Sequence, residues 1–177
     1  MRFKEHSEVE RPAWLGEAWE DNSWHNDACP HAILYLEVKE YPQAIVDFWV
    51  NYPQGEREIG PGFEVRFHHD WGSDDRSEVL YRGEDEGAAI MWERAARTAK
   101  SMIDAILARP DLNACKTFAA LHDHCDANVL GDVEAMTAEG EAHRDSTDDP
   151  EVSITGWAHA VHGGAVRIVD LWLGGRA

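Results

Sequence analysis

Histidine, cysteine and aspartate side chains gather in the segment LHDHCDAN, residues 121–128. These are the side chains that hold zinc in proteins, so the segment is a candidate metal site. Its ability to bind an ion depends on its secondary structure. In a helix each residue turns by about 100°, so His122 and His124 point about 200° apart and cannot share an ion. In a strand, His122, His124 and Asp126 project from the same face.

The composition of this segment favours a helix. It is rich in alanine and leucine, Val129 is its one β-branched residue after Thr117, and Gly131 follows as a C-terminal cap. His122 and Cys125 then fall on one apolar stripe. We therefore expect them to pack in the core rather than to carry out chemistry.

A second cluster, WHNDACPH, spans residues 24–31 just before an apolar segment. One interpretation is a polar turn held by side-chain hydrogen bonds. The other is a zinc-stabilised domain or a zinc hydrolase with His25, Cys29 and His31 as ligands, completed by Cys125 or His122. Structural zinc favours four nitrogen or sulfur ligands, often in closely spaced pairs, and this spacing is not one of the usual ones.

The third cluster is His68-His69-Asp70, near the end of a predicted strand. Strand alternation places His68 and Asp70 on the same polar face, where a carboxylate can orient an imidazole for general-base catalysis. A surface pair without a catalytic role is the alternative. We assign no catalytic residue and no cofactor from the sequence.

Charge is the most distinctive property of the composition. The formal net charge is −18, which argues against direct nucleic-acid binding because phosphate attraction requires clustered lysine and arginine. Between Asp123 and Glu151 lie ten acidic residues opposed only by Arg144, a local net charge of −9. This stretch is either a solvated loop that maintains solubility or a surface complementary to a basic groove of another protein.

The second interpretation gives a candidate partner-binding set. Its members are nine of the ten acidic residues of this stretch: Asp123, Asp126, Asp132, Glu134, Glu139, Glu141, Asp145, Asp148 and Asp149. Exposed tryptophans would add apolar contacts to this surface, because tryptophan often anchors protein interfaces. Trp14, Trp19 and Trp24 share no common helical or strand face, so we expect them to pack in separate places.

The pattern of apolar residues predicts an α+β fold that begins with a four-stranded antiparallel meander. The expected strands are residues 32–38, 44–52, 63–70 and 78–83, of which the second and third alternate with period two. The connections contain glycine, proline, aspartate and serine and are too short for a helical crossover.

Helices are expected after the sheet. Residues 87–110 carry an apolar stripe at helical spacing, so we expect one long helix that covers the sheet. We expect a second helix over residues 111–130 and an acidic loop over residues 132–151. A final apolar segment is expected over residues 152–174. The expected domains are therefore 1–110, with sheet and long helix, and 111–177, a small and mostly helical module.

The expected compartment is the cytoplasm. The first residues lack the apolar core of a secretion signal, and no apolar run approaches the roughly 20 residues of a membrane span. Three cysteines without a C-x-x-C pair fit a reducing compartment. We expect no membrane association, and the sequence leaves the oligomeric state open.

The segment KTFAALHDHCDANVLGD (116–132) and the ending AVRIVDLWLGG (165–175) together resemble small uncharacterised phage and prophage proteins. The resemblance covers about a third of the chain and implies an origin in a mobile element. We therefore expect a non-enzymatic inhibitor, similar in action to a DNA mimic or an anti-CRISPR protein. Its acidic surface would occlude a basic, nucleic-acid-handling defence protein of a bacterial host.

Overall fold

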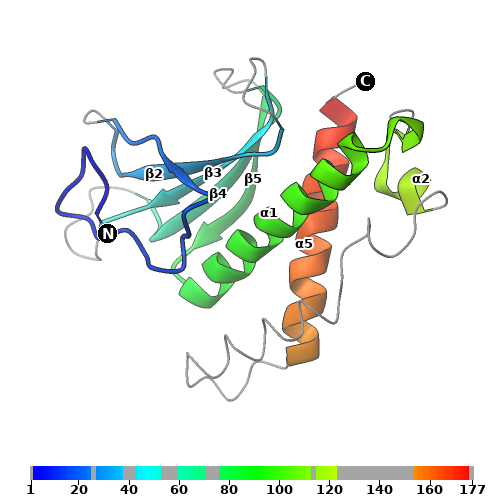
Figure 1. Ribbon diagram of the computed structural model, residues 1–177. Helices are drawn as coiled ribbons and strands as arrows, with labels where there is room; N and C mark the ends of the chain where they lie inside the picture. Colours follow the sequence, from blue (N-terminus) through cyan, green and yellow to red (C-terminus); the bar gives the residue numbers. More distant parts are fainter. Residues whose placement is uncertain are drawn as a thin grey trace. The chain divides into compact units, whose positions relative to one another are not determined.

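Five antiparallel strands form one open sheet and follow each other across it in chain order (Figure 1). They are β1 (Glu20–Asp21), β2 (His31–Tyr35), β3 (Ile45–Val50), β4 (Phe63–His68) and β5 (Ser77–Gly83). The structure is a computed structural model and describes residues 2–24, 27–37, 43–52, 60–70, 76–112, 115–122 and 154–175. Sequential neighbours pair because each connection is too short for a helical crossover.

The expected number of four strands is wrong by one. The additional strand, β1, pairs Glu20 with Ile33 and Asp21 with Ala32 at the edge of the sheet. A two-residue strand is too short to show the period-two alternation by which strands are recognised in a sequence. The four strands that were predicted are present, with ends shifted by a few residues.

The pairing register separates the sheet into an apolar and a polar face. Phe48 of β3 lies opposite Ala32 of β2 and Val65 of β4, whereas its neighbour Asp47 lies opposite Ile33 and Arg66. Directly opposed residues project from the same face, and successive residues from opposite faces. The alternation predicted for β3 and β4 is therefore confirmed.

The apolar face carries the core of the sheet. The rings of Trp14 and Trp19 both contact Phe48, with centroids 5.4 Å and 5.7 Å from it. The expectation that these tryptophans pack in separate places is wrong, because a loop brings both onto one residue. The buried guanidinium of Arg11 holds this loop by donating to the carbonyl of Trp19 at 2.8 Å. The indole of Trp19 in turn donates to Glu93 at 3.1 Å.

The long helix α1 spans Glu86–Leu107, close to the predicted range. Asp85 caps its first turn, since the carboxylate accepts a hydrogen bond from the Ala88 backbone at 3.2 Å. A short 3-10 turn, η2 (Pro110–Leu112), follows after the helix ends. The predicted apolar stripe is largely buried, including Ala95, Ala99, Met102 and Ile106.

Two further helices follow. Helix α2 covers Phe118–His122, and Asp170 accepts a hydrogen bond from the Phe118 backbone at 2.6 Å. Helix α5 covers Ile154–Gly175, with its apolar residues Ala165, Ile168 and Trp172 buried as expected. Of the helix predicted over 111–130, η2 and α2 lie among the described residues, and residues 123–130 lie outside them.

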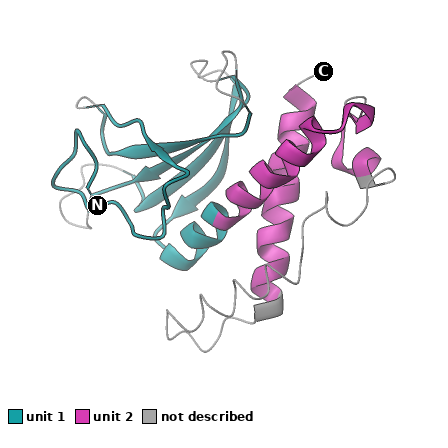
Figure 2. Cartoon of the chain, in the orientation of Figure 1, with its two compact units in different colours: residues 1–93 teal, residues 94–177 magenta. Residues whose placement is uncertain are grey.

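The chain forms two compact units, residues 1–93 and 94–177 (Figure 2). The first contains the sheet and the beginning of α1, and the second contains the rest of α1 with α2 and α5. The division thus falls inside α1, whereas the domain boundary expected from the sequence follows Pro110. None of the described helices is long and apolar enough to cross a membrane.

Candidate functional site

The acidic residues chosen as partner-binding candidates lie outside the described part of the chain. This applies to all nine: Asp123, Asp126, Asp132, Glu134, Glu139, Glu141, Asp145, Asp148 and Asp149. Their spatial grouping therefore stays a prediction. His25 and Cys125, two members of the alternative zinc set, also lie outside the described residues.

The polar face of the sheet carries a continuous row of functional side chains. The register places His31 of β2 opposite Trp49 of β3, Trp49 opposite Glu64 of β4, and Glu64 opposite Arg82 of β5. Opposed side chains stand close enough to interact directly. The row is therefore a consequence of strand pairing and cannot be found from neighbouring positions in the sequence.

Asp47 is the centre of a buried hydrogen-bond network on this face. Its side chain is on the same face as the row, and the residue is 1% exposed. One carboxylate oxygen lies 2.6 Å from Nδ1 of His31. The other accepts a hydrogen bond from Nε1 of Trp49 at 2.6 Å and lies 3.6 Å from Nε2 of His68. Three side chains thus compensate one buried carboxylate.

The network shifts the pKa values of its members in opposite directions. Burial acts most strongly on Asp47 and would raise its pKa, but hydrogen bonds and charge from His31 and His68 lower the pKa below its usual value. Burial likewise would lower the pKa of His31, but Asp47 and Asp27 raise it above the usual value. Both shifts favour an ion pair between His31 and Asp47.

Trp49 is held in a fixed orientation by this network. Its ring stacks on His31 with centroids 4.2 Å apart and an interplanar angle of 10°. Its indole nitrogen is bound to Asp47, as described above. Contacts to both the ring face and the ring edge leave the side chain little rotational freedom, so the indole is positioned before any ligand arrives.

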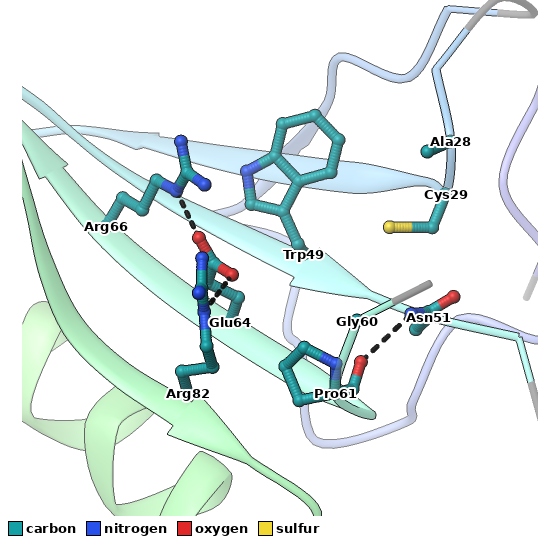
Figure 3. Close-up of a pocket in the computed structure, with 9 residues that line it drawn as sticks. All are labelled: Ala28, Cys29, Trp49, Asn51, Gly60, Pro61, Glu64, Arg66 and Arg82. Carbon is teal, nitrogen blue, oxygen red and sulfur yellow. Dashed lines mark hydrogen bonds and ion pairs between the residues drawn. The ribbon is translucent and has the colours of Figure 1, made fainter. Parts of the chain in front are cut away.

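The indole forms one wall of a cavity of about 430 Å³ (Figure 3). The described residues that line it come from β3, β4, β5 and two connecting segments: Ala28, Cys29, Trp49, Asn51, Gly60, Pro61, Glu64, Arg66 and Arg82. Glu64 accepts hydrogen bonds from Nε of Arg66 and, at 2.7 Å, from Nε of Arg82. The volume lies in the range of small-molecule sites.

The rim of the cavity near Asn51 requires a glycine. Gly60 has φ of 88°, in the left-handed region that favours glycine. A Cβ atom there would lie 3.3 Å from Nδ2 of Asn51, the atom that donates to the carbonyl of Pro61 at 3.0 Å. The backbone conformation thus keeps this side of the cavity in place.

Cys29 lines the cavity, but its environment disfavours nucleophilic chemistry. Burial raises the pKa of its thiol to about 11, and the negative charges of Asp27, Glu64 and Asp47 contribute to the increase. The thiolate is the nucleophile and the metal ligand, so Cys29 is almost entirely in its less reactive form at neutral pH. A cysteine-based catalytic site receives no support from this geometry.

The alternative zinc ligands are only partly described. Among the described residues, no three histidine, cysteine or acidic side chains lie close enough together to hold a metal ion. Both ring nitrogens of His31 face carboxylates, since Nδ1 contacts Asp47 and Nε2 lies 3.6 Å from Asp27.

His68 is buried and faces a different carboxylate from the one considered beside it in the sequence, whether as a catalytic pair or as a surface pair without a role. Asp70 follows it at the strand end, but the carboxylate that His68 faces in the structure is that of Asp47 on the adjacent strand. Register decides this pairing. A signal was present in the sequence, because Asp47 has apolar neighbours on both sides in AIVDFWV, and a carboxylate that is buried in such a strand needs hydrogen-bond partners.

An exposed aromatic residue lies at the end of the N-terminal segment. Trp24 is 61% exposed, although its backbone is held firmly: its nitrogen donates to Asp27 at 2.6 Å and its carbonyl lies 3.0 Å from Nε2 of His6. Nearby, Tyr52 lies 2.9 Å from His6 and donates to Glu8 at 2.6 Å, which raises the pKa of Tyr52 to about 12.

Two described features are therefore available for recognition: the cavity on the polar face and the exposed indole of Trp24. Comparison with family models, curated proteins and solved structures finds no match for the chain. Of the titratable groups that line the cavity, Glu64 is bonded to Arg66 and Arg82, and the thiol of Cys29 is held in its less reactive form.

Proposed function

We propose that the protein is a non-catalytic inhibitor whose acidic surface occludes a basic, nucleic-acid-handling protein of a bacterial host. The observation that carries this proposal is charge. The chain has a net charge of −18, of which half falls between Asp123 and Glu151, where only Arg144 is basic. A segment of this charge density attracts the lysine- and arginine-rich groove that normally holds nucleic acid.

Trp24 supports a role in binding from within the described residues. Large exposed aromatic side chains on a fixed backbone are frequent interface anchors, since they bury much area at low entropic cost. Trp24 combines 61% exposure with backbone hydrogen bonds to Asp27 and His6. Its surroundings include the acidic side chains of Asp27 and Glu8, which suit a basic partner.

The roles of the buried ionisable groups agree with a binding protein. His31 and Asp47 are almost wholly buried and bonded to each other, so neither presents a free proton-transfer atom to a substrate. Their contacts with Trp49 give them a structural role instead. Together with the neutral thiol of Cys29, this supports recognition as the function of the sheet face.

The biological setting is part of the same proposal. The resemblance to phage and prophage proteins suggests that the chain acts in the cytoplasm of an infected bacterium. Its target would then be a defence protein that binds nucleic acid, and the mechanism would be steric and electrostatic exclusion of that nucleic acid. Association would be fast at low salt and would weaken as salt screens the charges.

Competition by DNA tests this proposal. The full chain is immobilised and used to capture proteins from a bacterial lysate, and the captured protein is then challenged with double-stranded DNA or with raised sodium chloride. We expect a nucleic-acid-binding protein that DNA displaces and that elutes below about 1 M salt, where the screening length falls to about 3 Å. A captured partner that neither DNA nor salt displaces contradicts charge-based occlusion.

A second candidate is a zinc-binding domain or hydrolase that uses His25, Cys29 and His31 with Cys125. One observation favours it: Asp47 contacts Nδ1 of His31, as carboxylates do when they orient a metal-ligating imidazole. Elemental analysis of protein purified without chelators decides between the two. One equivalent of zinc that is lost in Cys29→Ser would favour the metal site.

A further inference from the structure

The described lining of the cavity on the polar face carries a net positive charge, in contrast to the net charge of the protein. Its described lining contains two guanidinium groups, those of Arg66 and Arg82, and one carboxylate, that of Glu64. Cys29 adds no charge at neutral pH, because the pKa of its thiol is about 11. One positive charge therefore remains uncompensated within the lining, on a chain whose net charge is −18.

We propose that this cavity binds a small anionic molecule that carries a planar ring. The anionic group, a carboxylate or a phosphate, is held by Arg66 and Arg82, and the ring lies against Trp49. This inference goes beyond the proposed inhibition of a basic protein, because it uses neither the acidic segment nor Trp24.

The two arginines are arranged to receive an anion. Each donates through Nε to Glu64, which fixes the direction of both guanidinium groups. Within the described part of the chain, Arg66 and Arg82 have no other hydrogen bond or ion pair. Their terminal nitrogens thus make no bond to another described residue, and guanidinium groups bind carboxylate and phosphate oxygens in pairs.

The indole supplies the surface for the ring. Trp49 lines the cavity, whereas His31, which stacks on it, does not. The histidine therefore supports the indole from outside the cavity, and Asp47 fixes its edge. Offset stacking on an indole that is already fixed costs little conformational entropy. The buried network of Asp47 and His31 therefore fixes the indole of Trp49, the surface against which the ring would lie.

The size of the cavity favours a small molecule over a polymer. About 430 Å³ accommodates a ring with one charged substituent, and typical sites for such ligands have roughly 300–1,000 Å³. Asn51, Gly60 and Pro61 line one part of the cavity (Figure 3). The apolar parts of Pro61 and Ala28 complete the surroundings of the ring.

Calorimetric titration of the full chain with matched pairs of probes tests the inference. For the phosphate, the pair is adenosine 5′-monophosphate and adenosine. For the carboxylate, it is indole-3-acetate and indole-3-ethanol. We expect saturable binding of at least one anionic probe, and about tenfold weaker binding of its neutral counterpart, because the neutral molecule cannot make charge-assisted hydrogen bonds to the guanidinium groups. The anionic probe that binds more tightly identifies the anion.

Variants locate the binding in the cavity. Arg82→Gln removes one guanidinium at an exposed position and should weaken the anionic probe about tenfold while leaving its neutral counterpart unchanged. Arg76→Gln is the matched control, because Arg76 is also exposed but does not line the cavity. It should bind both probes like the unmodified protein. Circular dichroism confirms that both variants are folded.

Three results overturn the inference. The first is the absence of saturable binding for both anionic probes. The second is equal affinity for an anionic probe and its neutral counterpart, which would remove the role of the arginines. The third is an equal loss in Arg82→Gln and Arg76→Gln, which would indicate attraction to any surface charge.

Discussion

Nδ1 of His31 lies 2.6 Å from a carboxylate oxygen of Asp47, and both residues are almost completely buried. The contact joins two strands and lies directly beneath the indole of Trp49, which binds both residues. A buried charge of this kind is costly unless it is paired and hydrogen-bonded. The network therefore couples the stability of the sheet to the shape of the cavity.

Removal of the central carboxylate should destabilise the protein strongly. Asp47→Ala leaves His31 without its 2.6 Å partner and Trp49 without its acceptor, both inside the sheet. Loss of one member of a buried pair typically costs about 3–5 kcal/mol. Urea unfolding should show this decrease, and Asp47→Asn should lose less, because its amide oxygen can still accept one hydrogen bond.

A surface ion pair provides the control for this measurement. Asp104 of α1 forms an ion pair with Lys100, with 2.9 Å between Nζ and the carboxylate oxygen. The side chain of Asp104 is 55% exposed. Pairs of this type contribute about 0.3–0.5 kcal/mol on a helix. Asp104→Ala should therefore change the free energy of unfolding much less than Asp47→Ala. Equal effects of the two substitutions would mean that the buried network does not stabilise the sheet.

The stability contributed by this pair should depend on pH. The pKa of Asp47 is lowered, so its contribution is present above the ordinary value of 3.8 and is lost as the pH falls through the shifted pKa. The pKa of His31 is raised, so its contribution is present below the ordinary value of 6.5 and is lost as the pH rises through the shifted pKa. The pair is therefore most stabilising between pH 3.8 and 6.5.

His31→Gln provides the comparison for this pH dependence. The difference in unfolding free energy between the unmodified protein and the variant should be largest inside that window and should shrink at higher pH. The measurement is denaturant unfolding at several pH values. A difference that grows as the pH rises above neutrality would contradict the raised pKa of His31.

Cys29 should react slowly with alkylating agents at neutral pH. Its pKa of about 11 lies roughly two units above that of a free thiol, so the thiolate is about 100-fold less populated. Mass spectrometry of the Cys29 peptide after iodoacetamide treatment gives the rate, with glutathione as the reference thiol. The rate should rise with pH towards 11. Alkylation at neutral pH as fast as that of glutathione would show that burial and the nearby acids do not suppress the thiolate.

Most of the fold follows from patterns in the sequence. The alternation in residues 63–70 predicted β4 and its two faces, and helical spacing predicted α1 to within a few residues of its ends. These signals are local, since they depend on neighbours along one element. The strand β1 was missed because two residues cannot display a period.

The candidate site was predicted far less well, and register is the reason. Asp47, His31 and Trp49 were each visible in the sequence, but only the pairing of β2 with β3 shows that they meet. Proximity along the chain led instead to the His68–Asp70 pair, which the register replaces with Asp47. None of Glu64, Arg66 and Arg82 stands out in the sequence by itself. They form a group only when the strands pair.

Trp24 should contribute to partner binding without contributing to stability. Because the indole is 61% exposed, Trp24→Ala removes little buried area and should leave the unfolding free energy nearly unchanged. Loss of an interface anchor costs more than 1 kcal/mol, so affinity for the captured host protein should fall by about tenfold. Val79→Ala, at a position 47% exposed on β5, is the control and should bind normally. Unchanged affinity in Trp24→Ala would remove Trp24 from the interface.

The acidic segment itself is tested most directly by neutralising part of it. One variant combines Glu134→Gln, Glu139→Gln, Glu141→Gln and Asp145→Asn. The matched control removes four exposed acids from the first unit: Glu5→Gln, Glu10→Gln, Glu17→Gln and Glu78→Gln. Both raise the net charge equally. We predict that the dissociation constant for the captured host protein, measured at 0.15 M salt, rises at least tenfold in the first variant and little in the control. Equal affinity of the first variant and the unmodified protein would contradict occlusion by the acidic segment.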